Sequence, residues 1–221
     1  MLQFYATKKL REKLPLDTNG LLPNAGRCPW LCQREPMEAN PLSGWHANLL
    51  TLQRRQCVLM LHNSTRFPVF MPGLIKADLA AFNDRFVDTF MNTLLKCGAT
   101  DHHMQAAHEY LRPLQATAPC SRSVLGTLNQ MQGDAESMIW HDNLNVAEIT
   151  GYRIGAWLAD TPCHIKGMTK DCLWPKRAML ALLEGVAAPI TLAESPTPPT
   201  TKPDPSFSNV VSMQDFRRRK S

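Results

Sequence analysis

Two polar side chains in an otherwise apolar strand are the first candidates for a functional site. In the stretch SGWHANLLTLQRRQCVLML, His46 and Asn48 lie two residues apart, so both point to the same face of an extended strand. Arg54 and Arg55 occupy the adjoining turn. If that face is open, these four side chains could bind a nucleotide or an acidic chain.

The same two side chains have a structural interpretation. If their face is buried, both must be hydrogen-bonded, because an unpaired buried polar group costs about 1–3 kcal/mol. Asn48 would then bond to the long loop 15–44, and His46 would pack under Trp45 or beyond the sheet edge. We expect a half-covered rim, near the start of a helix at 121–140, as the place that suits both interpretations.

The start of that helix is a second candidate. The stretch CSRSVLGTLNQM places Arg122, Ser123 and Asn129 among apolar residues. Ser121 or Ser123 could cap the helix, whose free N–H groups and dipole attract anions, and Arg122 would add a charge. The site would then hold a phosphate or a carboxylate. The alternative is a serine cap, a surface arginine and a close-packed glycine.

Metal chemistry is weakly indicated. Zinc sites usually combine two close cysteine pairs. Here Cys28 and Cys32 in CPWLC form one pair, but Cys163, His164 and Cys172 are too widely spaced for the second. We therefore expect no metal and no cofactor.

Catalytic signatures are also missing from the sequence. It contains no G-x-S-x-G elbow, Walker loop or G-x-G-x-x-G. A small metal-independent nuclease acting on RNA could use His46 as base, with Arg55, Arg122 and Ser123 holding the phosphate. Nothing in the sequence brings these four residues together.

The C-terminal segment differs in composition from the rest. Residues 189–208 are rich in proline, threonine and serine, which bury too little surface to offset their ordering entropy, so we expect disorder. The end of the chain adds a compact basic motif that either aids solubility or binds a protein or nucleic acid as a tethered segment; its candidate residues are Phe216, Arg217, Arg218, Arg219 and Lys220.

Hydrophobic periodicity predicts an α+β fold. Apolar alternation and turn residues predict about four strands, which we expect to form an antiparallel sheet, at 2–7, 45–52, 57–62 and 67–71. The period then changes to that of helices, which we expect to pack on one face of the sheet, at 76–98, 101–111, 121–140, around 146–158, and 175–186. Residues 1–187 would form one domain, with the long loop 15–44 inside it, and 188–221 a tail.

Composition fits a globular protein of 221 residues with a net charge of +5, which tolerates an acidic partner without requiring one. No apolar run approaches the roughly 20 residues that a membrane helix needs, and the N-terminus does not look like a secretory signal. Seven irregularly spaced cysteines suggest reduced thiols in a cytoplasm.

Four short motifs, FYATKK, WHANLLTLQRRQCVL, SRSVLGTLNQM and LADTPC, occur in an order that resembles a bacterial domain-of-unknown-function family, six-nine-three-three. The resemblance spans roughly residues 2–187 and implies no established activity. Some members are fused to a domain found on plasmids and transposons, which implies a link to mobile elements. Here the loop 15–44 is longer than usual, and TLNQM replaces S-L-N-D, which removes an acidic residue.

Two function classes follow from these observations. The first is a non-catalytic binding or regulatory module of the bacterial cytoplasm, whose partner is a protein or nucleic acid. The family resemblance implies that it is an accessory of mobile-element biology. The second is the small nuclease. Absent catalytic signatures favour the first.

Overall fold

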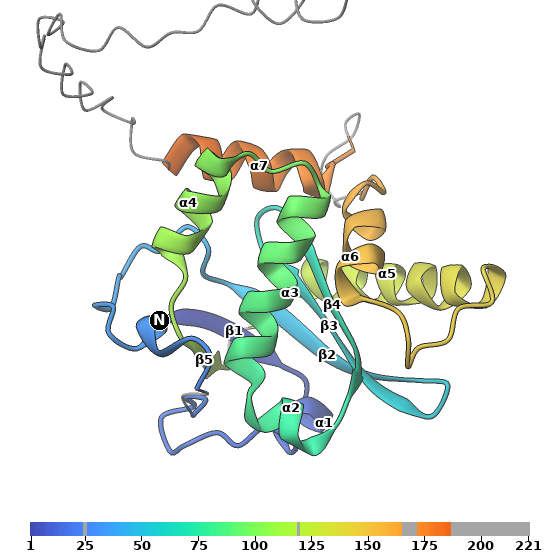
Figure 1. Ribbon diagram of the computed structural model, residues 1–221, viewed down its shortest axis with the longest axis horizontal. Coiled ribbons are helices and arrows are strands. Elements are labelled where there is room, and N and C mark those ends of the chain that lie inside the picture. Colours follow the sequence, from blue (N-terminus) through green and yellow to red (C-terminus); the bar gives the residue numbers. More distant parts are fainter. Residues whose placement is uncertain (24–25, 119, 165–171, 187–221) are drawn as a thin grey trace, which may run out of the picture. The chain divides into compact units, whose positions relative to one another are not determined.

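A five-stranded mixed sheet forms the centre of the fold in the computed structural model (Figure 1). The structure describes residues 1–23, 26–118, 120–164 and 172–186. The strand order is β4-β3-β2-β1-β5. The strands are β1 (Leu2–Ala6), β2 (Trp45–Leu52), β3 (Arg55–His62), β4 (Pro68–Leu74) and β5 (Leu114–Thr117).

The α+β class is confirmed, and the sheet has one strand more than expected. Strands β2, β3 and β4 pair antiparallel, as the hairpin spacing predicts, whereas β1 runs parallel to both β2 and β5. Tyr5 is therefore paired with His46 on one side and Thr117 on the other. The sequence did not indicate β5, because four residues after a proline are too few to show a period of two.

The helices lie close to their predicted positions. The expected helix 76–98 is interrupted at Ala81, which divides it into two. The basic run after β1 forms a single helical turn, and the long loop contains the 3-10 turn Pro29–Leu31. The α-helices are α1 (Lys8–Arg11), α2 (Lys76–Ala80), α3 (Phe82–Lys96), α4 (Asp101–Tyr110), α5 (Arg122–His141), α6 (Gly151–Ala159) and α7 (Pro175–Val186).

Helices cover both faces of the sheet, so the expectation that they pack on one face is wrong. On one face, Trp45 of β2 packs edge-on against Phe86 and Phe90 of α3. On the other, apolar side chains of β3 and β4 pack against those of α5 and α6. Figure 1 shows α3 in front of the sheet and α5 behind it. The reason is β3, which is apolar on both sides and needs cover on each.

The second face is covered only in part. Helix α5 contacts β2 and β3 but leaves the β1–β5 half of the sheet open. There Gln3 is exposed, and Tyr5, Gln115 and Thr117 are half-buried. The open half begins beside His46 and Asn48.

Two sequence predictions fall outside the described residues: the disordered tail with its motif at 216–220, and the domain end at 187. Among the residues that are described, no helix combines the length and the apolar character needed to cross a bilayer.

Candidate functional site

His46 is buried, and both of its ring nitrogens are engaged. It is 2% exposed. Its Nε2 accepts the backbone N–H of Ser121 at 2.8 Å, and Nδ1 lies 2.6 Å from Oδ1 of Asn63. Because a backbone N–H can only donate, Nε2 carries no proton, and Nδ1–H donates to Asn63. Burial lowers the pKa of His46, which favours this neutral form. The ring therefore fastens the start of α5 to β2.

Asn48 connects the sheet to the side of the same helix. Its Oδ1 accepts the hydroxyl of Thr7 at 3.0 Å, and its Nδ2 donates to Oε1 of Gln132 on α5 at 3.4 Å. These are not the partners in loop 15–44 that the buried interpretation predicted. Asn48 is half-buried and lies at the rim between the covered and open halves of the sheet.

Tyr5 and Cys120 complete the surroundings of His46. The ring of Tyr5 lies 5.3 Å from the imidazole, centroid to centroid. Burial, followed by the nearby thiol of Cys120, raises the pKa of Tyr5. Sequence reasoning missed Tyr5. Its signal was its alternation with the buried Phe4 and Ala6, which places it on the face that bears His46.

Arg66 is a second residue that sequence reasoning missed. It follows β3 in the turn NSTR, has a φ of +57° and is 6% exposed. Its Nη2 donates to Oγ of Ser123 at 3.2 Å, in the first turn of α5. No sequence signal was available, since arginines in polar turns are mostly exposed.

The other candidates at α5 have different surroundings. Arg122 and Asn129 are both exposed. Ser121 occupies the N-cap position, but its side chain makes no capping hydrogen bond. The expected serine cap is therefore wrong, and no described side chain accepts an N–H group of the first turn.

Of the residues expected for a nuclease, His46 lies at the start of α5, which carries Arg122 and Ser123, but Arg55 lies far from them. His46 pairs with Leu61, whereas Arg55 pairs with Leu52 at the other end of the hairpin. Leu61 lies six positions beyond Arg55 along β3, which at about 3.3 Å per residue separates the two sites by about 20 Å.

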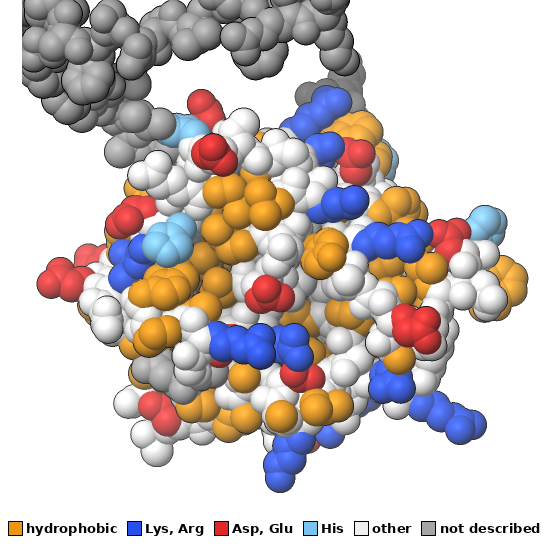
Figure 2. Space-filling model, in the orientation of Figure 1, with side chains coloured by type: hydrophobic (Ala, Val, Ile, Leu, Met, Phe, Trp, Pro, Cys, Tyr) orange, Lys and Arg blue, Asp and Glu red, His pale blue; other side chains and the backbone are white. Residues whose placement is uncertain are grey.

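Arg54 and Arg55 instead line a groove at that other end, which we call the basic groove. It is a cavity of about 540 Å³ formed by the end of α1, the β2–β3 turn and the start of α2. Its charged side chains are Glu12, Lys13, Arg54, Arg55 and Lys76. In Figure 2, cationic side chains project from this edge of the molecule.

The β2–β3 turn has an unusual backbone. Gln53 and Arg54 have φ values of 47° and 63°, in the left-handed region that favours glycine or asparagine. The side chain of Gln53 holds the turn in place: its amide donates to the carbonyl of Leu144 at 2.8 Å and accepts the N–H of Val146 at 2.9 Å.

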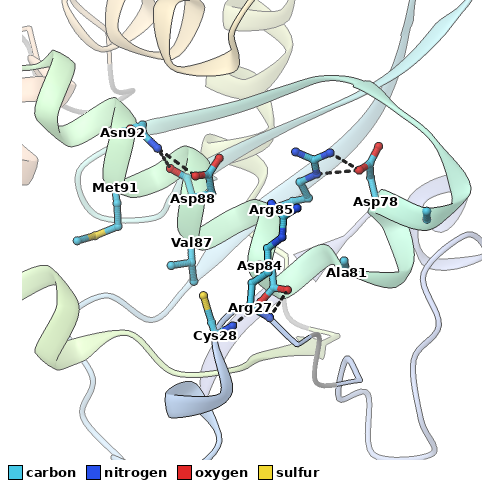
Figure 3. A pocket seen from close by; sticks show the side chains of 11 residues that line it. Arg27, Cys28, Asp78, Ala81, Asp84, Arg85, Val87, Asp88, Met91 and Asn92 are labelled. Atoms are coloured by element: carbon cyan, nitrogen blue, oxygen red, sulfur yellow. Dashed lines mark hydrogen bonds and ion pairs between the residues drawn. The ribbon is translucent and has the colours of Figure 1, made fainter.

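A separate cavity of about 360 Å³ lies between the loop around Cys28 and helices α2 and α3 (Figure 3). Asp84 accepts the backbone N–H groups of Arg27 and Cys28, each at 3.1 Å, and Asp78 forms an ion pair with Arg85. The charged groups of Asp78, Asp84 and Arg85 are therefore already bonded within the protein. The cavity is therefore a weaker candidate than the basic groove.

The cysteines and histidines considered for zinc are not gathered into a metal site. Sγ of Cys172 lies 3.7 Å from Nε2 of His164, while Cys28 and Cys32 are in the long loop. The described part of the chain contains no group of three or more side chains that could hold a metal ion.

Comparison with known proteins identifies a family. A model of the family described as Domain of unknown function (DUF6933) matches residues 3–178. No curated protein and no solved structure matches the chain. The matched segment contains the four motifs noted in the sequence and nearly all of the fold described above. The chain belongs to this family, whose name assigns it no activity.

Proposed function

We propose that the protein is a non-catalytic binding module that holds the phosphate backbone of nucleic acid in its basic groove. The observation that carries the proposal is the charge of the groove, where Lys13, Arg54, Arg55 and Lys76 face a single carboxylate, Glu12. None of these four cations forms an ion pair with a described residue. Their charges are therefore available to an anionic partner.

The cations come from three separate segments and extend along an edge. Lys13 follows α1, the arginines form the hairpin tip, and Lys76 begins α2. The exposed Lys8, Lys9 and Arg11 of α1 extend the same surface. A row of exposed cations suits the regularly spaced charges of a nucleic acid backbone better than the irregular charges of an acidic protein surface.

The strained turn supports a binding role. Each non-glycine residue in the left-handed region costs about 1 kcal/mol, and such strain is concentrated at functional sites. Because Gln53 is hydrogen-bonded on both sides, the turn holds Arg54 and Arg55 in a fixed position before any partner arrives. Prior ordering reduces the entropy lost on binding.

The lining of the groove also predicts how the nucleic acid is bound. The groove is lined by described residues alone, and no aromatic side chain is among them. Bases therefore have no ring to stack on, and binding should depend on phosphates and show little preference for sequence.

The nuclease alternative has less support. The base it requires, His46, has both ring nitrogens occupied and lies about 20 Å from Arg55, one of the residues expected to hold the phosphate. As the setting of the proposed binding we retain the bacterial cytoplasm and mobile-element biology. The first rests on cysteine usage and the second on the family resemblance.

The test is binding by the full chain to labelled DNA and RNA of unrelated sequences, followed by fluorescence anisotropy. With four phosphate contacts, log K for duplex DNA should fall with log salt concentration at a slope of about −3.6 between about 50 and about 200 mM salt. The double variant Arg54→Gln/Arg55→Gln should lose about half of that slope. The control, Lys96→Gln/Arg153→Gln, removes the same charge from exposed positions on α3 and α6.

If the two double variants lose the same part of the salt-dependence slope, net charge alone drives binding, and the proposal would fail. Tighter binding of an acidic peptide than of any nucleic acid, with the same dependence on Arg54 and Arg55, would assign the groove to a protein partner instead.

A further inference from the structure

Arg66 is a buried cation whose charge is not balanced by any carboxylate that the structure describes. The residue is 6% exposed, and its Nε is buried without a hydrogen-bond partner. None of the ion pairs among the described residues includes it. Burying a charge without an opposite charge is strongly unfavourable, so such an arrangement is rare unless something else compensates it.

The neighbours of Arg66 do not compensate it. Among the described residues, only the thiolate of Cys163 would favour the charged form of Arg66, but burial raises the pKa of Cys163 to about 11, so the thiol is neutral at physiological pH. Burial lowers the pKa values of His46 and His62, and the charge of Arg66 acts in the same direction, which favours the uncharged form of both rings. The site therefore has a net positive charge.

The first turn of α5 adds to this positive potential. Arg66 reaches it through its hydrogen bond to Ser123, the second residue of a helix of 20 residues. No described side chain caps the helix. His46 accepts the N–H of Ser121, so the N–H groups of the next residues, in the first turn, have no acceptor among the described side chains. Such amides and the helix dipole favour an anion. Ser123 and Arg122 are exposed, so this point is open to solvent.

We propose that Arg66, Ser123 and the first turn of α5 form a binding site for a tetrahedral oxyanion, either free phosphate or the phosphate group of a small metabolite. A guanidinium provides paired N–H donors that match the oxygens of phosphate, and the serine hydroxyl adds a third donor. The backbone amides of the helix supply the remaining donors.

This site is independent of the basic groove. Arg55 is the first residue of β3, and Arg66 follows the end of the same strand. The two sites therefore lie at opposite ends of the sheet. A phosphate ion bound at Arg66 should not compete with nucleic acid bound in the groove, and Arg54→Gln/Arg55→Gln should bind phosphate as the unchanged protein does.

The experiment is isothermal titration calorimetry of the full chain with inorganic phosphate and with glycerol 3-phosphate, at constant ionic strength. Saturable binding of either probe is expected, and tighter binding of the ester would identify a metabolite as the ligand. Arg66→Met, which keeps most of the volume but removes the charge, should weaken binding at least tenfold. Ser123→Ala should weaken it severalfold, whereas the control Arg153→Gln should leave it unchanged.

A melting curve of each variant without phosphate separates binding from folding. Arg66→Met should melt no lower than the unchanged protein, because it removes an uncompensated buried charge. If this variant fails to fold, Ser123→Ala still tests the site, since Ser123 is exposed.

The rival explanation is a carboxylate from the segment 165–171, which lies outside the described residues and includes Asp171. Suppose that phosphate does not bind the unchanged protein. If Asp171→Asn also lowers the melting temperature of the unchanged protein, but does not lower it when added to Arg66→Met, then Asp171 balances the charge of Arg66. That result, or phosphate binding that is insensitive to Arg66→Met, would overturn the proposal.

Discussion

His62 should make the stability of the protein depend on pH. The side chain is 1% exposed and lies against the ring of Trp45. Its Nε2 is 3.2 Å from the carbonyl oxygen of Ser43, to which it donates, and its Nδ1 is 2.9 Å from Oγ1 of Thr65, whose hydroxyl it accepts. Both hydrogen bonds suit the neutral ring. Burial lowers the pKa of His62 to about 4, and the charge of Arg66 acts in the same direction.

The sign and size of the effect follow from the two pKa values. The unfolded chain protonates this histidine near pH 6.5, but the folded protein does so only near pH 4. Between these values the unfolded state binds more protons, so the free energy of unfolding falls as the pH falls, by about 1.36 kcal/mol per pH unit. The total loss is about 3 kcal/mol. His62 contributes no pH dependence above pH 6.5.

Urea denaturation of the unchanged protein and of His62→Gln at about pH 7 and about pH 4.5 measures this contribution. Glutamine places an amide N–H near the position of Nε2, and it does not titrate. Other groups titrate in both proteins and cancel in the comparison. On acidification the unchanged protein should lose about 2–3 kcal/mol more than the variant. Equal losses in the two proteins would refute the assignment of a buried neutral histidine.

Two further predictions concern the contacts between helices and sheet. Gly151→Ala should lower the melting temperature strongly, because a Cβ there would lie 2.0 Å from the carbonyl oxygen of Phe70. Gly155→Ala should lower it less, because its Cβ would meet only a side chain, at 3.1 Å. Thermal denaturation monitored by circular dichroism compares the two variants. Gln53→Ala should lower the free energy of unfolding by about 1–3 kcal/mol in urea, because it removes two hydrogen bonds to the backbone after α5. Arg54→Gly, at the neighbouring left-handed position, should not lower the free energy of unfolding, because glycine adopts that conformation without strain. A loss as large as that of Gln53→Ala would show that the backbone at Arg54 is not strained.

Local patterns in the sequence were sufficient for most of the elements. The alternation around His46 and Asn48 predicted β2, and the helical period after residue 74 predicted α3, α5, α6 and α7 within a few residues. The break at Ala81 was not predicted, because the apolar stripe continues through it. Strand β5 and the parallel pairing of β1 depend on partners far apart in the chain, which no local period reports.

The candidate site was also predictable only where local sequence patterns were sufficient. The expected proximity of His46 to the start of α5 follows from the need to satisfy a polar group beside an apolar strand, and the bond from Ser121 to His46 meets that need. Arg122 is exposed, and the arginine that contacts the first turn of α5 is Arg66 instead. A turn arginine becomes buried only when a helix from elsewhere in the chain packs over it, so its burial is a property of the tertiary structure.

The interplay between structure and binding is clearest at His46. A histidine that serves only as a buried hydrogen-bonding group and one that belongs to a site are usually treated as alternatives, but the proposed anion site would depend on the structural bond of His46. By accepting the N–H of Ser121, His46 fixes the first residue before α5, and Ser123 is then held against Arg66. Loss of the imidazole should therefore leave the arginine in place and displace the helix amides. Segments that are distant in the sequence, FYATKK, WHANL and SRSVLG, meet at this contact, although none of them contains a catalytic signature.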